Sequence, residues 1–447
     1  MPTFPKYESY KDSGVEWLGE IPNHWQISRL KHSIQSATNG IWGGDIDEDN
    51  ENDGVVCIRV ADFNRQNLSV SLDKLTRRKV TDSEFQSRKL SPGDLLLEKS
   101  GGGDNQLVGQ VVIFEHDFPA VCSNFLARLI TNKEFDSKFL NYVHATLYAL
   151  RVNYKHIKQT TGIQNIDGNS YLSELFAHPA LKEQRRIVEF LDRTTGEIDC
   201  AIAQKQRLIE LLQEQKAILI NQAVTKGLNP NVPMRDSGIE WLGEIPEHWQ
   251  LKAFKRITTR VDVGIAEAAT HAYTDQGVPI IRSGNVRTNY MDTREVLYIK
   301  EWFAEKNSSK YLSSGDILTV RTGANAGMTA VVPKELDHSQ CFTLLVATPK
   351  PNQVSQFYSY YINTPMIQAV FAFEGWGAAQ LNLSVPILKE LPIVEPPSQE
   401  QQEIVSYLQK ALSEFESTQQ TTRRQISILQ EYKQILIAYA VTGKIKV

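Results

Sequence analysis

The sequence has few cysteines, and they lack the spacing that would join them to a metal or to one another. Cys57, Cys122, Cys200 and Cys341 are scattered through 447 residues without a CxxC pair. This scatter argues against a structural zinc site and against a disulfide framework. We therefore expect a reducing, cytoplasmic environment.

Long apolar runs are also absent. No stretch approaches the ~18 residues needed to span a bilayer, and the start MPTFPKYESY lacks the basic-then-apolar pattern of a signal peptide. The hydrophobic content of 41% suits ordinary globular cores, and 447 residues suffice for two to four domains. We expect a soluble protein that does not contact a membrane.

The motifs of common hydrolases are missing as well. The nine histidines form no HExxH or HxH pattern, and no GxSxG occurs. Asp94, Glu98 and Lys99 faintly resemble a nuclease carboxylate cluster, but adjacent residues on a strand point to opposite faces. The second half has Val320 and Arg321 at the equivalent of Glu98 and Lys99. We therefore favour a turn at Asp94 and predict neither catalytic nor metal-binding residues.

The chain lacks the basic excess that is typical of nucleic-acid-binding proteins, because its net charge is -4. Local basic clusters do occur, at 74–79, 88–89, 151–158 and 252–260. Each could equally be a solvated face, which is the commoner explanation of a charge run. Net charge therefore neither supports nor excludes a nucleic-acid partner.

Two segments of the chain occur twice. The longer one, Glu183 to Thr225, recurs without a gap as Glu400 to Thr442, with 18 of 43 positions identical. Apolar residues in both copies are spaced by threes and fours, which predicts a helix with one apolar stripe. The stripe positions are Ile187, Leu191, Ile198, Leu212, Leu219, Ile404, Leu408, Phe415, Leu429 and Leu436.

The second copy is polar between Thr418 and Gln425, so it would be marginal as a lone helix. Two stripes that face each other would bury both, which predicts a paired, coiled-coil-like spacer. Each helix would be roughly 65 Å long at ~1.5 Å per residue. The alternative is two ordinary core helices in separate domains.

The shorter repeat is rich in tryptophan. Residues 12–26 read DSGVEWLGEIPNHWQ and residues 236–250 read DSGIEWLGEIPEHWQ, identical at 13 of 15 positions. Glycine, proline and tryptophan without periodicity predict an irregular, well-packed docking segment. Stacking of the tryptophans on nucleic-acid bases is the alternative.

The segments between the repeats predict short strands followed by a helix, an α+β arrangement. In the first half we expect a polar loop at 40–54, strands at 55–60, 94–97, 108–114 and 125–130, and a helix at 137–150. In the second half we expect strands at 278–282, 316–320, 329–332 and 342–347, a helix at 355–373, and a capping box formed by Ser398 and Gln401.

Glycine loops follow equivalent strands in the two halves. Gly101, Gly102 and Gly103 come after Lys99, and Gly323 to Gly327 come after Arg321. Exposed amides beside a cation suit the approach of a phosphate, although a simple hairpin is an equal alternative. The candidate DNA contacts are Lys99, Gly101, Gly102, Arg59, Asn64, Asn124, Arg282, Asn285, Arg321 and Asn325.

These motifs carry a family likeness. The doubled DSG(V/I)EWLGEIP(N/E)HW segment, the run Thr161 to Gly168 (TGIQNIDG) and the helix start EQRRIVEFLD closely resemble the specificity subunit of Type I restriction-modification systems. In the second half, Gly377 to Asn382 (GAAQLN) replaces TGIQN, which leaves the equivalent contacts there open.

The resemblance implies two mixed α/β target-recognition domains in a pseudo-twofold arrangement, separated by two long antiparallel helices. On this basis we expect recognition domains at 1–180 and 236–397, spacer helices at 181–226 and 398–447, and a linker at 227–235. Antiparallel pairing would also bring Val447 near the first tryptophan-rich segment.

The resemblance further implies that each recognition domain binds half of a bipartite double-stranded DNA target. Two methyltransferase subunits would dock on this chain. A restriction and translocase subunit would dock on it as well. S-adenosylmethionine, ATP and Mg would belong to those partners, so we expect no cofactor in this chain. The alternatives are a structural coiled-coil adaptor, or a DNA methyltransferase or nuclease in its own right, but no NPPY-like segment supports the latter.

Overall fold

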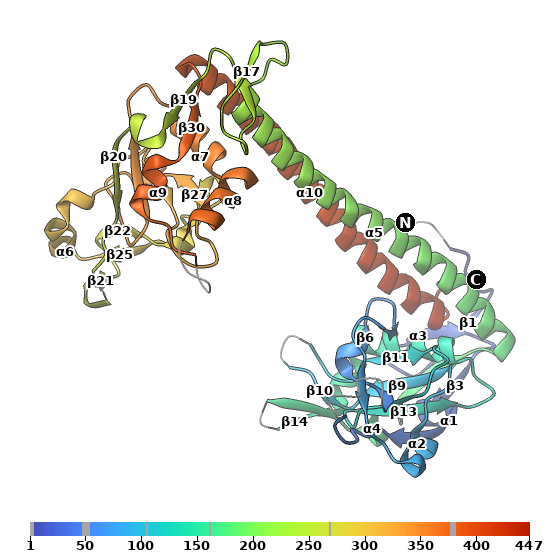
Figure 1. The fold of residues 1–447 in the computed structure, drawn as a ribbon. Coiled ribbons are helices and arrows are strands. Elements are labelled where there is room, and N and C mark those ends of the chain that lie inside the picture. Colours follow the sequence, from blue (N-terminus) through green and yellow to red (C-terminus); the bar gives the residue numbers. More distant parts are fainter. Residues whose placement is uncertain (1–3, 47–53, 104–105, 161, 268–269, 376–380) are drawn as a thin grey trace. The chain divides into compact units, whose positions relative to one another are not determined.

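The computed structural model describes residues 4–46, 54–103, 106–160, 162–267, 270–375 and 381–447 (Figure 1). The chain divides into two compact units, residues 1–205 with 424–447 and residues 206–423. Both boundaries fall inside long helices, α5 (Leu181–Lys226) and α10 (Ser398–Val441). Each unit therefore contains its own globular part and a portion of both helices.

The two long helices pair in opposite directions. In the first unit Asp199 of α5 binds Lys433 of α10, and Lys205 bonds to Gln425. In the second unit Lys216 of α5 lies 3.4 Å from Glu416 of α10. Residue numbers rise along α5 while those of their partners fall along α10, which confirms the predicted antiparallel pair.

Burial along the predicted apolar stripe is uneven. The stripe is buried towards the helix ends and half-buried in their middle parts. The buried positions are Ile187, Leu191, Ile198, Ile404, Leu408 and Leu436, and the half-buried ones are Leu212, Leu219, Phe415 and Leu429. The globular part of each unit covers the helix ends, and this explains the difference.

The main sheet of the first unit has the strand order β4-β13-β9-β11-β7-β6. Leu95 of β9 pairs with Ile113 of β11 on one side and Leu129 of β13 on the other. The strands are β4 (Ile34–Asn39), β13 (Leu126–Thr131), β9 (Asp94–Glu98), β11 (Val111–Phe114), β7 (Ser69–Val70) and β6 (Phe63–Asn64).

Smaller sheets surround this one, in the orders β12-β5-β8, β10-β15-β14, β1-β2 and β16-β3. Their strands are β12 (Ala120–Cys122), β5 (Val55–Ile58), β8 (Thr76–Arg78), β10 (Ser100–Gly101), β15 (Ile163–Ile166), β14 (Ile157–Thr160), β1 (Tyr10–Asp12), β2 (Glu20–Pro22), β16 (Leu175–His178) and β3 (Gln26–Arg29). The helices of this unit are α1 (Leu30–Ser33), α2 (Asp82–Arg88), α3 (Ser137–Ala149) and α4 (Gly168–Tyr171), with 3-10 turns η1 (Val60–Asp62) and η2 (Val152–His156).

The second unit repeats this topology with a different sequence. Its sheet β20-β29-β26-β27 matches β4-β13-β9-β11, and Ile317 of β26 pairs with Val331 and Ala347 as Leu95 pairs in the first unit. These strands are β20 (Thr258–Val263), β29 (Leu345–Pro349), β26 (Ile317–Thr319) and β27 (Thr329–Val331).

The remaining strands of the second unit also have counterparts in the first, except β21, because the sheet β12-β5-β8 of the first unit has no fourth strand. They are β21 (Tyr273–Thr274), β25 (Leu297–Ile299), β22 (Val278–Ile281), β28 (Gln340–Cys341), β23 (Val286–Arg287), β24 (Tyr290–Met291), β17 (Met234–Asp236), β18 (Glu244–Pro246), β19 (Gln250–Ala253) and β30 (Pro392–Glu395). The helices are α6 (Glu301–Lys306), α7 (Ser355–Ile362), α8 (Pro365–Glu374) and α9 (Val385–Glu390), with 3-10 turns at Phe254–Arg256, Thr270–Ala272, Ser283–Asn285, Ser308–Lys310 and Lys334–Leu336.

Several local predictions need correction. The helix expected over 355–373 is two helices, because Pro365 cannot continue α7 and instead begins α8. The strand expected from Val108 starts only at Val111, after Gly109 takes a positive φ of 102°. The strand expected from Phe342 starts at Leu345, after Thr343 takes a positive φ of 47°. Residues 47–53 of the predicted polar loop lie outside the described residues.

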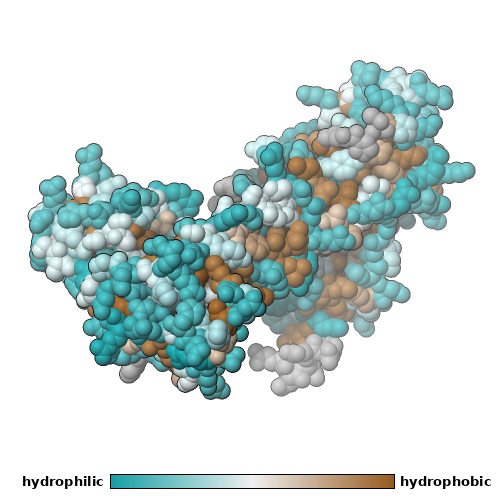
Figure 2. All heavy atoms as spheres, turned by 90° about the horizontal axis from the view of Figure 1, so that it is seen from above, coloured by the Kyte–Doolittle hydropathy of each residue, from teal (hydrophilic) through white to brown (hydrophobic). Residues whose placement is uncertain are grey.

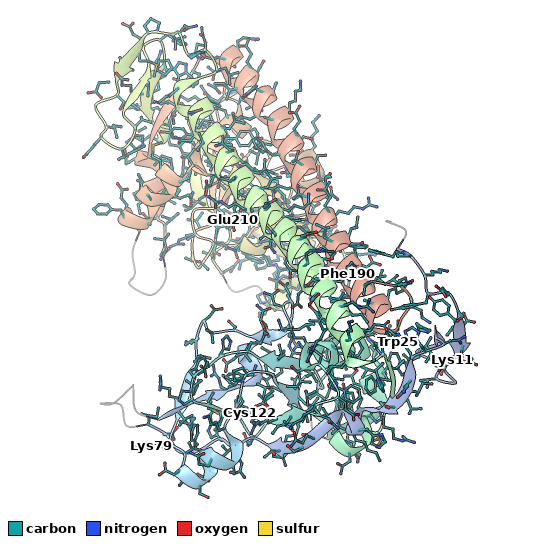
Figure 3. The ribbon with its side chains drawn as sticks, turned by 90° about the vertical axis from the view of Figure 1, so that its right-hand side faces the viewer. Lys11, Trp25, Lys79, Cys122, Phe190 and Glu210 are labelled. Carbon is teal, nitrogen blue, oxygen red and sulfur yellow. The ribbon has the colours of Figure 1, made fainter. Side chains whose placement is uncertain are left out.

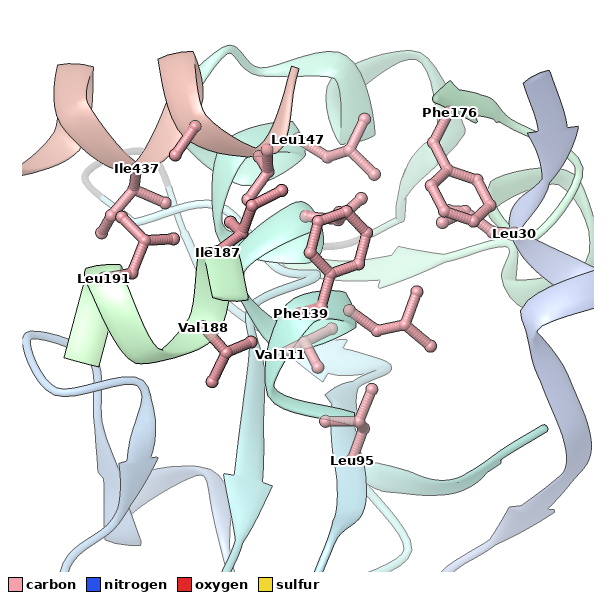
Figure 4. Packing of buried hydrophobic residues seen from close by; sticks show 14 of the residues in the cluster. Leu30, Leu95, Val111, Phe139, Leu147, Phe176, Ile187, Val188, Leu191 and Ile437 are labelled. Atoms are coloured by element: carbon pink, nitrogen blue, oxygen red, sulfur yellow. The ribbon is translucent and has the colours of Figure 1, made fainter. Parts of the chain in front are cut away.

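The core of the first unit joins the sheet to the long helices. In Figure 4, Ile187 and Leu191 of α5, Ile437 of α10 and Phe139 of α3 converge above Leu95 of the sheet. All five side chains are buried. The globular part and the helix pair of this unit therefore share one hydrophobic cluster.

The C-terminus lies against the N-terminal segment within the first unit, as the antiparallel arrangement predicts. The amide of Lys446 donates to the carbonyl of Pro5 at 2.8 Å, and the ammonium of Lys444 donates to the carbonyl of Leu18 at 2.8 Å. Burial lowers the pKa of Lys444. These bonds hold the end of α10 to the first tryptophan-rich segment.

The exposed surface is mixed in character. On the face drawn in Figure 2, hydrophilic residues form most of the surface, and hydrophobic residues form separate patches among them. Within the described residues, no helix has both the length and the apolar run required to cross a membrane.

Candidate nucleic-acid interface

Each unit presents the same turn, strand and glycine loop. In the first unit the amide of Ser91 donates to the carboxylate of Asp94 at 2.7 Å, and the amide of Asp94 donates back to the Ser91 carbonyl at 3.0 Å. Ser313 and Asp316 make the same two bonds in the second unit, at 3.0 and 2.9 Å. The predicted turn at Asp94 is confirmed.

Both aspartates of these turns also bind an arginine on a neighbouring strand. Arg128 of β13 lies 2.7 Å from Asp94, and Arg260 of β20 lies 3.0 Å from Asp316. Because both carboxylates are buried and satisfied, they stabilise the sheet and are not available as metal ligands. In the described part of the chain, no three His, Cys, Asp or Glu side chains cluster as a metal site would require.

The predicted cations Lys99 and Arg321 occupy equivalent places at the ends of β9 and β26. The Lys99 ammonium donates to the side-chain oxygen of Asn39 at 2.8 Å, and burial lowers the pKa of Lys99. Arg321 donates from Nε to the carbonyl of Leu383 at 3.3 Å and is partly exposed. Both side chains are thus held at the base of a loop while retaining unused donor groups.

The loops themselves have backbone conformations that favour glycine. Gly101 and Gly102 have φ of 131° and 64°, and a side chain at Gly102 would lie 2.8 Å from the backbone of Gln106 and Val108. Gly323 and Gly327 have φ of 96° and 93° in the second unit. Residues 104–105 are outside the described residues.

A strand from later in the chain pairs with each glycine loop. Ser100 and Gly101 pair with Asn165 and Gln164 of the TGIQN run. Gln164 is buried and accepts a hydrogen bond from the amide of Val108 at 3.1 Å. This run of the family motif therefore holds the glycine loop in place.

The second unit makes an equivalent pairing despite its different sequence. Thr322 pairs with Asn382, and the amide of Gly323 donates to the carbonyl of Leu381 at 3.3 Å. Gly377 to Gln380, the substituted part of the motif, lies outside the described residues. Leu381 and Asn382 thus take the place of Gln164 and Asn165.

A buried ion pair beneath the first glycine loop was missed by sequence reasoning. Arg65, in the β6–β7 turn, lies 2.9 Å from Glu98, which is fully buried. Burial raises the pKa of Glu98, although the charge of Arg65 opposes this shift. With its amide suitably oriented, Gln106 also accepts from Arg65 at 2.9 and 2.6 Å. The separation of 33 residues between Arg65 and Glu98 left no sequence signal for this pair.

The second unit uses neutral groups at this place. Val320 replaces Glu98, and the hydroxyls of Thr319 and Thr329 hydrogen-bond across the hairpin at 2.8 Å. The amide of Asn363 reaches Asn289 and the carbonyl of Thr329, both at 2.7 Å. The two glycine loops therefore have similar backbones, but an ion pair lies beneath the first loop and neutral hydrogen-bonding groups lie beneath the second.

The arginine and asparagine candidates on β5 and β22 serve their own turns. Arg59 binds Asp62 at 2.9 Å. Asn285, at the equivalent of Asp62, is buried, accepts from the amide of Arg282 at 3.0 Å and donates to the carbonyls of Asp292 and Glu295. Asn285 therefore has no group left for a base, whereas Arg282 is exposed.

The other asparagine candidates differ in their availability. Asn64 accepts from the amide of Asn67 at 3.1 Å and so closes its own turn. Asn124 is exposed, next to Phe125, whose carbonyl accepts from the amide of Lys99. Asn124 and Asn325 make no side-chain hydrogen bond to any described residue. Asn124 thus lies beside the residue that binds the Lys99 backbone, and Asn325 lies in the loop that follows Arg321, whereas Asn64 and Asn285 close their own turns.

The tryptophan-rich repeats dock onto the starts of the long helices. Trp25 is fully buried and donates to Glu183 at 3.2 Å. Figure 3 labels Trp25 near the start of α5. His24 also contacts Glu183 at 3.0 Å. Although burial raises the pKa of Glu183, hydrogen bonds from Tyr7, His24 and Trp25 bring it below its usual range.

The second repeat makes the same contacts on α10. Trp249 and His248 lie 3.0 and 2.9 Å from Glu400, which is the counterpart of Glu183 in the repeat. Trp249 is buried, and Trp241 packs partly buried against the same core. The predicted packing role is confirmed, and the buried tryptophans are not available to stack on bases.

Gln184 and Gln401 follow Glu183 and Glu400, and each binds the backbone of segments that the glutamate does not contact. Gln184 accepts from the amide of Asp136, before α3, at 2.9 Å and donates to the Pro179 carbonyl at 3.0 Å. Gln401 accepts from the amide of Val354, before α7, at 2.9 Å and donates to the Pro396 carbonyl at 2.9 Å. The predicted capping box of Ser398 and Gln401 is therefore wrong, because the Gln401 side chain is engaged elsewhere.

Comparisons with known proteins agree with this architecture. Residues 266–426 match the family model described as Type I restriction modification DNA specificity domain. The type I restriction enzyme EcoKI specificity subunit of Escherichia coli is 22% identical over 80% of this chain and 76% of its own length.

Two solved structures share the fold at 14% identity. One is a chain from work on complex assembly and conformational transition of the type I R-M system, with a TM-score of 0.69 over 94% of this chain and 98% of that one. The other is the HsdS subunit from Thermoanaerobacter tengcongensis, with a TM-score of 0.51 over 95% of this chain and 98% of that one. In sequence and in fold, the chain is therefore similar to the specificity subunits of Type I restriction-modification systems.

Proposed function

We propose that this chain is the DNA sequence-recognition subunit of a Type I restriction-modification complex and binds a bipartite target, with one half-site for each unit. The observation that carries the proposal is the duplicated module itself. In each unit one turn, one strand, one cation and one glycine loop recur on matching sheets. The supports beneath the loops differ, as expected for two modules that recognise different sequences.

Within this proposal Lys99 and Arg321 bind phosphate, together with the amides of Gly101, Gly102 and Gly323. Such contacts position the protein on the duplex without selecting a sequence. Asn124 and Asn325 are the preferred base contacts among the asparagines, because their amides are not engaged by described residues. An asparagine can bind adenine through two hydrogen bonds in the major groove.

The chain supplies recognition and not catalysis in this proposal. Methyltransferase and restriction subunits would bring S-adenosylmethionine, ATP and Mg to the complex. The paired helices offer a docking surface, because apolar residues of α5 remain exposed on one face at Leu208, Leu211 and Ile218. Ile428 of α10, the repeat counterpart of Leu211, is exposed as well. Exposed apolar positions on a helix suit a partner helix.

Mapping of methylated adenines in a host that carries this chain and its methyltransferase partner tests the recognition role. We expect methylation at a split sequence, and an exchange of residues 27–180 for those of another specificity subunit should change one half of that sequence only. A host that methylates the same sites without this chain would contradict the proposal.

Association with the methyltransferase tests the docking surface. Leu211→Lys and Ile428→Lys should each weaken co-elution of the two proteins in size-exclusion chromatography, because each buries a charge in an apolar contact. Gln213→Lys, at an exposed polar position of the same helix, is the matched control. Equal co-elution of all three variants would place the contact elsewhere.

A further inference from the structure

One phenylalanine of the second unit is almost entirely exposed. Phe373, in the last turn of α8, has 91% of its surface accessible, whereas Phe371 and Ile367 of the same helix are buried. Its neighbours Ala372 and Glu374 are also exposed. Phenylalanine is among the residues most often buried, which makes this exposure unusual.

The helix that carries Phe373 is fastened to the glycine loop of its unit. Gln368 of α8 donates to the carbonyl of Gly327 at 3.1 Å. Gly375, just after the helix, packs against Leu381, whose carbonyl accepts from the amide of Gly323. Figure 1 draws α8 next to β27, which ends this loop. The exposed ring is therefore held on the same part of the unit as Arg321.

The first unit has a similar aromatic residue at the matching place in the topology. Tyr154, in the turn η2 that follows α3, is 64% exposed. Its neighbour Asn153 donates to the carbonyl of Val108 at 2.8 Å, which fastens η2 to the end of the first glycine loop. Arg151 and Lys155 on either side of Tyr154 are exposed cations.

The two aromatic residues arise from different local structures. Phe373 lies on a helix and Tyr154 on a 3-10 turn, yet each follows the helix after the sheet and precedes the segment that pairs with the glycine loop. No identity of sequence connects the two positions. In each unit, different local structures thus place an exposed ring beside a cationic glycine loop, which indicates a shared use.

We propose that Phe373 and Tyr154 enter the DNA as wedges between bases of their respective half-sites. This inference rests on the proposed function and adds a mode of binding to it. The cation and loop amides bring the sugar-phosphate backbone close, and the ring then replaces part of the base stacking at one step. Apolar wedges of this kind unstack and kink a duplex at flexible steps, which adds selection by deformability to selection by base contact.

The test uses the full chain with its methyltransferase partner. The DNA is a duplex that carries the target sequence identified by mapping of methylated adenines. Phe373→Ala should weaken binding about tenfold or more, the usual scale for loss of an aromatic contact to a base. The slope of log K against log salt should stay unchanged, because no charge is lost. Phe373→Leu, which keeps an apolar wedge, should bind more tightly than Phe373→Ala.

A second readout locates the effect on the DNA. Duplexes with 2-aminopurine at successive adenine positions report unstacking as a rise in fluorescence. Phe373→Ala should abolish the rise in the half-site bound by the second unit only, and Tyr154→Ala in the other half-site only. The control is Trp302→Ala, which removes an exposed ring from α6, drawn on the opposite side of the same unit in Figure 1. This variant should bind as the unaltered chain does.

Three outcomes would overturn the inference: binding by Phe373→Ala within twofold of the unaltered chain, a fluorescence pattern unchanged by both substitutions, or an equal loss for Trp302→Ala. Thermal unfolding of each variant should match that of the unaltered chain, since the rings are exposed. If the unaltered chain itself fails to select the target duplex over a scrambled one, the proposed function fails, and the two failures are thereby distinguished.

Discussion

The ammonium of Lys433 lies 2.7 Å from both carboxylate oxygens of Asp199, across the pair of long helices in the first unit. It donates a third bond to the carbonyl of Gln66 at 2.9 Å, in the β6–β7 turn of the same unit. In the repeat, Asp199 corresponds to Glu416 and Lys433 to Lys216, and these two residues also pair, at 3.4 Å, in the second unit. The same acid and lysine positions of the repeat thus pair twice, with the acid on α5 and the lysine on α10 in the first unit and the reverse in the second.

Substitution of the two lysines should have unequal effects on stability. Lys433→Met removes a buried ammonium that makes three hydrogen bonds and leaves Asp199 unpaired, so we expect a loss of about 2 kcal/mol. Lys216→Met breaks a more exposed pair, for which less than ~0.5 kcal/mol is expected. Urea unfolding of the full chain, followed by hydrogen exchange in α10 and α5, measures both. Equal losses would show that the bond to Gln66 contributes nothing.

The buried pair of Arg65 and Glu98 should be costly to break and cheap to replace. Arg65→Met leaves a fully buried carboxylate without its partner, and a loss of about 3 kcal/mol is expected. Combining it with Glu98→Val, the residue found at this place in the second unit, should restore most of that loss. Thermal unfolding of the two single variants and the double variant measures the coupling. A double variant less stable than Arg65→Met would contradict this account.

The stability that Glu183 supplies should depend on pH in the acid range. Its hydrogen bonds hold the folded pKa below the unfolded value, so the stabilisation is present above the unfolded pKa and disappears as the pH falls through the folded pKa. Glu183→Gln should therefore lower stability by about 1 kcal/mol at pH 7, and the difference should shrink below about pH 4. Urea unfolding at several pH values measures it, with Glu189→Gln, exposed on the same helix, as control. A constant difference down to pH 3 would refute the assignment.

The two loop cations should contribute to DNA affinity through charge. Lys99→Ala and Arg321→Ala should each weaken binding and reduce the salt slope by about one, since each removes one phosphate contact. Fluorescence anisotropy with the target duplex at several salt concentrations provides the measurement. Lys158→Ala, which removes an exposed lysine already paired with Asp167 at 2.9 Å, is a control. Unchanged affinity and slope for Lys99→Ala or Arg321→Ala would remove that residue from the interface.

The repeated parts of the chain could be predicted because equivalent residues of the two copies make the same contacts. Glu183 and Glu400 stand at the same place in both helices, and each receives a tryptophan and a histidine from its own repeat. Periodicity predicted the helices to within a few residues, because a helix pattern is local. The strands were predicted less exactly, since Gly109 and Thr343 delay them by taking positive φ.

The candidate contacts could be predicted only in part. Lys99 and Arg321 follow glycine loops in both halves, so their equivalence was visible in the sequence. The partners of Arg59 and Asn285 could not be predicted, because backbone geometry decides whether a polar side chain points outward or closes its own turn. The exposure of Phe373 could not be predicted, since the neighbouring residues in the sequence do not show which phenylalanine of α8 is buried.

By itself the sequence determined the duplication, the two long helices and the docking role of the tryptophan-rich segments, because each of these depends on patterns within a short stretch. Only the tertiary structure decided that Arg65 reaches Glu98, that Lys433 reaches Asp199 and Gln66, and that Phe373 is left uncovered. These contacts join residues far apart in the chain, and their free energy exists only once packing has brought the residues together.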